Sequence, residues 1–168
     1  MNGTPPVIEM CVLGMEWLLW QVLSQSSSSF CPVDIVRRLN PDDAQPRDGL
    51  ILIEQSQEEE IVEKTDGNEL LLHKSQLIHV GVFCMPEDGA FEPIDPIINQ
   101  RASDVWRALM DQTYEGNKSL RYGGQALATS SCLGVQPLNL PDGVFAGFII
   151  PVDVRYCHRE NDPTFNGV

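Results

Sequence analysis

Basic residues are scarce in this sequence. Eleven Lys and Arg stand against 24 Asp and Glu in 168 residues, which gives a formal net charge of −13 at pH 7. Proteins that wrap nucleic acid need Lys and Arg to displace counterions from the phosphates, so this composition argues against that class. An acidic wall past which DNA slides without binding is compatible with the same charge.

The sequence also lacks the residue spacings that mark metal, redox and catalytic sites. Its five cysteines are scattered, odd in number and without a CxxC pair, so reduced thiols are expected in place of a disulfide framework. The three histidines fall into no zinc-binding spacing. Cys157 and His158 are neighbours on a predicted strand, so their side chains point to opposite faces and cannot pair as nucleophile and base. We therefore expect no metal, no cofactor and no enzymatic activity.

Apolar runs long enough to cross a membrane are missing as well. The longest candidate, Val7–Leu23, contains Glu9, Glu16 and Gln21 and falls short of the roughly 20 apolar residues that a membrane helix needs. Residues 1–6 carry no basic side chain, so a secretory signal is not expected. The chain is therefore predicted to have no membrane partner.

That same apolar run is the first element that the sequence does contain. Its spacing predicts a helix over Val7–Leu23 with one continuous apolar face. Leu13, Trp17 and Trp20 add a second apolar side, which is more than one packed helix face needs. We expect these side chains to lie in the core, and contact with a neighbouring subunit is the alternative.

The clearest strand signal lies near the C-terminus, over residues 147–159. Apolar residues alternate there with mostly polar ones, which predicts a strand with one buried face. Pro151 has no N–H to donate and predicts an edge position or a bulge. The charged, turn-rich residues 160–168 are expected to form a C-terminal tail. The predicted buried face comprises Phe148, Ile150, Val152, Val154 and Tyr156.

Three further strands are predicted in the first half of the chain, at residues 33–39, 50–57 and 77–85. Asp-Gly at residues 66–67 is typical of a two-residue hairpin turn. The acidic run 58–60 is interpreted as the exposed, charged end of a hairpin, because a core does not accept unpaired carboxylates. The middle of the chain is thus predicted to be an antiparallel meander.

A second helix is predicted to open at Asp95-Pro96, with Asp95 as its N-cap, and to end near residues 111–112. Asp104 is expected to flank its apolar stripe or to face away from it. A Gly-Gly break at residues 122–124 precedes a weaker strand, predicted at residues 125–133.

Together these elements predict an α+β fold, in which a mostly antiparallel β-sheet carries two main helices packed on one face. Residues 1–168 are expected to form a single domain. Within it, residues 1–6 are an N-terminal extension and residues 160–168 the C-terminal tail.

The order of these elements resembles that of the tail terminator proteins of long-tailed bacteriophages. The resemblance rests on the N-terminal helix, the meander that ends at residues 77–85, and the helix Q-R-A-S-D-V-W-R-A-L-M-D-Q. It continues through the Gly-Gly step at residues 122–125 to the final run I-P-V-D-V-R-Y-C-H-R-E-N-D-P. The element order covers nearly the whole chain, and the specific residues cover about its last third.

The resemblance implies a structural virion protein with a tail-terminator-like fold. Such proteins form hexameric rings that cap the tail tube, stop its polymerisation and join the tail to the head or neck. Genomic DNA passes through the lumen without sequence-specific binding. The implied partners are further copies of the chain, the tail tube protein, a head–tail stopper or other neck protein, and the tape measure and sheath proteins. The implied location is the tail or neck of the virion, after assembly in the host cytoplasm.

Two alternatives stay open beside this resemblance. One is another phage neck protein, a head-completion stopper or an adaptor. The other, from a different class, is a monomeric cytoplasmic ligand-binding α+β domain. The candidate interface or lumen residues are Glu58, Glu59, Glu60, Trp17, Trp20, Arg155 and Arg159.

Overall fold

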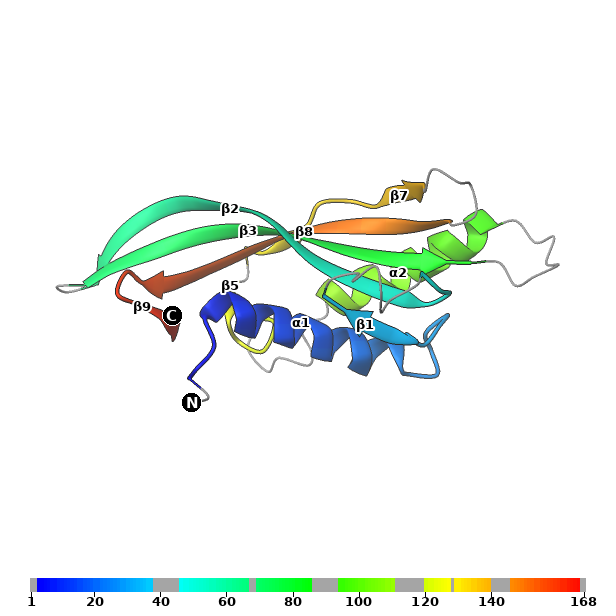
Figure 1. The fold of residues 1–168 in the computed structure, drawn as a ribbon, viewed down its shortest axis with the longest axis horizontal. Coiled ribbons are helices and arrows are strands. Elements are labelled where there is room, and N and C mark those ends of the chain that lie inside the picture. Colours follow the sequence, from blue (N-terminus) through cyan, green and yellow to red (C-terminus); the bar gives the residue numbers. More distant parts are fainter. Residues whose placement is uncertain are drawn as a thin grey trace.

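The computed structural model describes residues 3–37, 46–66, 69–85, 94–110, 120–127, 129–139 and 146–166. Figure 1 shows how the helices and strands within these ranges are arranged. Their bounds in chain order are α1 Val7–Leu23, β1 Asp34–Val36, β2 Leu50–Asp66, β3 Glu69–Cys84, α2 Ile94–Met110, β4 Leu120–Arg121, β5 Ala126–Leu127, β6 Ser131–Cys132, β7 Gln136–Asn139, β8 Ala146–Arg159 and β9 Asp162–Asn166.

Most of the described strands belong to one curled sheet. The long strands β2, β3 and β8 lie side by side and run antiparallel, while β1 adds to β2 in parallel. The short strands β6, β7 and β9 pair with the other edge of β8, and β4 and β5 form a small sheet of their own. Both helices lie on the same side of the long strands (Figure 1). The predicted α+β class, with two helices on one face of a mostly antiparallel sheet, is confirmed.

The core lies between the two helices and the face of β8 that the alternation predicts to be buried. All five predicted residues of that face are at most 2% exposed. Ile78 and Val80 of β3 lie opposite Val152 and Ile150 in register, so the same face of the neighbouring strand is apolar too. The helices cover it with fully buried side chains such as Met15. The period-two pattern of β8 therefore identifies the core face correctly.

The helix α1 spans Val7–Leu23, as its apolar spacing predicts. Gly14 in its interior lets the turn between β4 and β5 come close. Tyr122, Gly123 and Gly124 in that turn all have positive φ angles, which glycine adopts at little cost. The predicted Gly-Gly break is thus confirmed as a turn, and it packs directly against α1.

The helix α2 begins at Ile94, one residue before the predicted N-cap, so Asp95 lies inside the first turn. Its predicted end near residues 111–112 lies outside the described residues, in which the helix extends to Met110. Within the described part of the chain, no helix combines the length and the apolar character needed to span a lipid bilayer.

Asp104 on α2 is buried, contrary to the prediction that it flanks the apolar stripe or faces away. It is 4% exposed, and its carboxylate accepts the backbone N–H of Ser29 at 2.7 Å. Arg107 lies 3.4 Å from the other carboxylate oxygen. The buried carboxylate is stabilised by these two partners, and its hydrogen bond to Ser29 links the segment after α1 to α2.

Several strands differ from their predicted extent. β2 continues through the acidic run 58–60 to Asp66, so this run lies inside a strand and not at a hairpin end. The chain reverses between Asp66 and Glu69, where the Asp-Gly signal predicts the hairpin. The weak strand predicted at residues 125–133 is divided into β5 and β6, and the expected tail contains β9, which folds back onto β8.

Pro151 lies inside β8, opposite a one-residue shift in register between β6 and β7, which agrees with the predicted edge or bulge position. On one side β8 pairs with β3 without interruption. On the other side β6 ends at Cys132 and β7 begins at Gln136. The carbonyl of Pro151 accepts the N–H of Leu133 at 2.8 Å, and its nitrogen faces the same side. The missing N–H therefore falls in the gap between two short strands, where the described residues make no ladder.

Candidate functional site

An apolar stripe runs along the outward side of α1. It consists of Leu13, Trp17 and Trp20, which recur at helical spacing, and we call it the α1 stripe. Their exposed fractions are 46%, 49% and 37%. The expectation that these side chains lie in the core is therefore wrong, because other sides of α1 already fill it. Contact with a neighbouring subunit remains the alternative interpretation.

Glu58 faces the helix-covered side of the sheet, where Lys74 and Tyr156 hold its carboxylate. The Nζ atom of Lys74 lies 2.5 Å from Glu58 Oε1, and the Tyr156 hydroxyl donates to Oε2 at 3.0 Å. The hydrogen bond from Lys74 lowers the pKa of Glu58, while burial raises the pKa of Tyr156 well above its ordinary value. Glu58 is thus an ionised residue that ties β2 to β3 and β8, and its side chain still reaches solvent.

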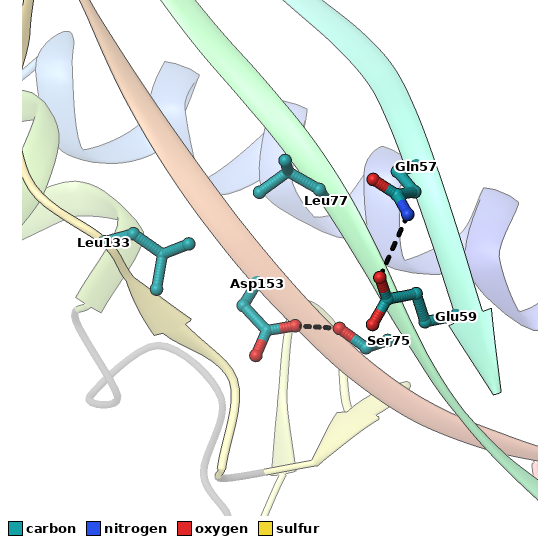
Figure 2. A pocket seen from close by; sticks show the side chains of 6 residues that line it. All are labelled: Gln57, Glu59, Ser75, Leu77, Leu133 and Asp153. Carbon is teal, nitrogen blue, oxygen red and sulfur yellow. Dashed lines mark hydrogen bonds between the residues drawn. The ribbon is translucent and has the colours of Figure 1, made fainter. Parts of the chain in front are cut away.

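Glu59 lies on the opposite, uncovered face of the sheet, at a recess of about 150 Å³ that we call the sheet recess (Figure 2). Gln57 Nε2 donates to Glu59 Oε1 at 3.0 Å, and the Ser75 hydroxyl donates to Asp153. The two carboxylates give the recess an acidic wall, and two leucines give it an apolar one. In Figure 2 the helices lie behind the strands from which these side chains project. The lining residues are Gln57, Glu59, Ser75, Leu77, Leu133 and Asp153.

The other candidate residues of the sheet lie apart from one another. Arg155 is on the uncovered face, where its Nε atom pairs with Asp153 at 2.9 Å. Arg159 ends β8, at the far end of the sheet. Glu60 belongs to β2, and its side chain is outside the described part of the structure. Of the predicted site residues, Trp17 and Trp20 lie on the α1 stripe, and Glu59 and Arg155 lie on the uncovered face of the sheet. Glu58 and Arg159 lie apart from both, so the predicted residues do not converge on one site.

One charged cluster was missed in the sequence. Arg37, directly after β1, donates hydrogen bonds to Glu9 and Glu16 of α1. The two glutamates are seven residues apart, which places them on one side of a helix. The spacing of the two glutamates could have predicted that a basic side chain binds between them. The single positive charge of Arg37 offsets one of the two negative charges beside the α1 stripe.

The described residues hold no group of three or more His, Cys, Asp or Glu placed to bind a metal ion. Each of the five cysteines lies outside any disulfide. No protein-family model matches the chain, and no curated protein sequence matches it significantly. Among the described residues, the features left exposed near the predicted site residues are the apolar α1 stripe and the sheet recess.

Proposed function

We propose that this protein is a bacteriophage tail terminator, a structural virion protein that acts as a hexameric ring and not as an enzyme. The ring caps the tail tube, stops its polymerisation and joins the tail to the head or neck. The α1 stripe is the observation that carries this proposal. Its side chains are exposed although the core is filled without them, and such apolar patches are typical of surfaces that a partner covers.

The charge of the chain supports the same proposal. The acidic run 58–60 lies in the middle of β2, where the side chains of Glu58 and Glu59 are exposed. Subunits with a formal charge of −13 around a lumen would repel the phosphates of DNA, so the genome passes without being held. The tail tube protein and a stopper of the neck are the partners that such a ring meets at its two ends.

A monomeric ligand-binding domain would need a larger pocket than either of two recesses that the described residues line. Two recesses lined by described residues measure about 150 and 280 Å³. Pockets for small molecules usually enclose roughly 300–1,000 Å³ and bury most of the ligand. A stopper or adaptor of the phage neck stays the nearest alternative, because the same surfaces would serve another ring.

Tail-tube assembly tests the proposal directly. Purified protein is mixed with polymerising tail-tube subunits of the phage that encodes it, and the tubes are measured by negative-stain microscopy. We expect shorter tubes with extra density at one end. A variant carrying Trp17→Gln and Trp20→Gln should keep its circular dichroism spectrum, because both side chains are exposed, and should lose the capping activity.

Unchanged tube lengths with bare ends would count against termination. A protein that then binds purified neck components would be assigned to the stopper or adaptor class. A protein that binds neither tubes nor neck components would lie outside all three virion roles.

A further inference from the structure

The outer edge of β2 is covered by another strand over three residues. β1 pairs there in parallel and ends with Val36 opposite Leu52, and the described part of the chain contains no strand that continues this row. The next stretch, residues 53–55, keeps its regular pairing with β3 on the inner side, because the first register shift follows Gln55. An edge of this kind is a template for a strand from another chain.

A recess of about 280 Å³ lies against the same stretch, and we call it the edge recess. Three consecutive residues of β2 line it, although successive side chains of a strand point to opposite faces. The edge recess therefore lies along the edge of the strand, in the place that a further strand in line with β1 would occupy. Its lining residues are Val12, Arg37, Ile53, Glu54 and Gln55.

The charges around the edge recess determine which kind of strand fits there. Arg37 pairs with Glu9 and Glu16 of α1, and Glu54 adds a third carboxylate. Three carboxylates against one guanidinium give a formal sum of −2. A second copy of this chain would bring a formal charge of −13 to the same edge, so repulsion opposes pairing between copies. A basic segment would be attracted instead.

We propose that the edge of β2 at residues 53–55 binds an extended basic segment of another protein, which adds to the sheet as a short strand. Every second side chain of such a segment points toward α1 and enters the edge recess, where Val12 and Ile53 favour an apolar residue. The side chains between them point to the uncovered face beside Glu54, which favours Lys or Arg. The matching segment therefore alternates apolar and basic residues.

A capped peptide of alternating Lys and Val, six residues long and labelled with fluorescein, serves as the probe. Fluorescence anisotropy with the parent and with Glu54→Lys gives the dissociation constants. Glu59→Lys is the matched control, because it changes the net charge equally at another exposed residue of β2, beyond the first register shift. Both variants should keep the circular dichroism spectrum of the parent.

We expect Glu54→Lys to weaken binding by about 10-fold or more, and Glu59→Lys to weaken it by less than about 3-fold. A peptide of alternating Glu and Val should show the reverse preference and bind Glu54→Lys about 10-fold more tightly than the parent. This exchange of charges identifies the side chain that the basic residues contact.

Strand addition also requires the N–H groups along one edge of the peptide. N-methylation of the valines blocks one edge and N-methylation of the lysines blocks the other, while all side chains remain. We expect one of these two peptides to bind about 10-fold more weakly than the other. Amide hydrogen exchange within residues 53–57 should slow when the unmethylated peptide is bound.

Other outcomes would overturn the inference. Equal weakening by Glu54→Lys and Glu59→Lys would show that the peptide follows the net charge of the protein. Equal affinities of the two N-methylated peptides would show that no strand is added, and a parent that leaves the peptide free at about 1 mM protein has no such site.

These results are independent of the proposed function. Peptide binding together with a protein that leaves tail tubes uncapped would keep the strand site and refute tail termination. Capping by a protein that leaves the peptide free would keep the function and refute the strand site.

Discussion

Gly14 illustrates how closely α1 packs against the turn between β4 and β5. A Cβ atom at this position would lie 2.3 Å from the carbonyl oxygen of Tyr122 and 2.4 Å from its carbonyl carbon. Both are backbone atoms of a turn whose residues have positive φ, so they cannot rotate away as the end of a side chain does. Glycine in a helix is ordinarily less stable than alanine, and here the close approach reverses that preference.

Gly14→Ala is therefore expected to lower the free energy of unfolding by about 1–3 kcal/mol, the usual cost of overpacking. Chemical denaturation followed by circular dichroism measures the change. Gly3→Ala is the control and should match the parent, because a Cβ at Gly3 meets nothing within 4 Å. A Gly14→Ala variant as stable as the parent would mean that α1 and the turn separate without cost.

Glu58 contributes to stability in a pH-dependent way. Lys74 lowers its pKa in the folded protein, so the ionised carboxylate stabilises the fold above the ordinary pKa of a glutamate. This contribution is lost as the pH falls through the lowered pKa. Glu58→Gln should thus destabilise the protein at pH 7, and the difference from the parent should shrink below about pH 4.

Denaturant titrations of parent and variant at several pH values measure this difference. Glu59→Gln is the matched control, because the Glu59 carboxylate accepts a hydrogen bond from the neutral Gln57 amide on the other face of the sheet. Equal pH profiles for Glu58→Gln and Glu59→Gln would refute the role of the Lys74 contact.

At the scale of elements, α2 depends on the apolar side that it turns toward the sheet. Val105 on this side is 0% exposed and belongs to the core. Val105→Asp would bury an unpaired carboxylate, and we expect it to cost about 3 kcal/mol or more. Ser103→Asp, at an exposed position of the same helix, should stay near the parent. Thermal unfolding distinguishes the two, and equal melting temperatures would mean that α2 is not anchored through Val105.

The elements with a regular apolar period were predictable from the sequence. The bounds of α1 and the buried face of β8 follow from local alternation, which depends only on backbone geometry and burial. β2 was not predictable beyond residue 57, because three successive carboxylates resemble a loop. The strand continues through them because the Glu58 carboxylate accepts hydrogen bonds from Lys74 and Tyr156, while the Glu59 side chain is exposed to solvent.

The remaining differences come from contacts between residues distant in sequence. The carboxylate of Asp104 is buried where it accepts a hydrogen bond from the backbone N–H of Ser29, which lies 75 residues away in the sequence. β9 pairs with the end of β8, and the local sequence of residues 162–166 does not indicate that this partner is available. The tryptophans of the α1 stripe could be recognised as surplus apolar residues, but only the packing of α1 shows that they are exposed.

At the scale of the whole molecule, the long edge of β2 is the obvious place for unwanted association. β1 covers this edge only opposite Leu50, Ile51 and Leu52, and the described residues provide no strand beyond them. The uncovered part carries the acidic run 58–60 and two register shifts. Charges and bulges of this kind oppose pairing between sheet edges. These features argue against pairing between copies through this edge, and the α1 stripe is the surface that we propose for assembly.

Ionic strength should therefore favour assembly. Copies that each carry a formal charge of −13 repel one another, and salt screens this repulsion without weakening apolar contacts. We expect the oligomer measured by light scattering to become more stable, with a lower dissociation constant, when NaCl is raised from about 0.02 to about 0.5 M. The stripe variant with Trp17→Gln and Trp20→Gln should stay monomeric throughout, since screening alone supplies no contact. An oligomer that dissociates on addition of salt would instead be held by pairs of opposite charges, and the apolar stripe would not be its interface.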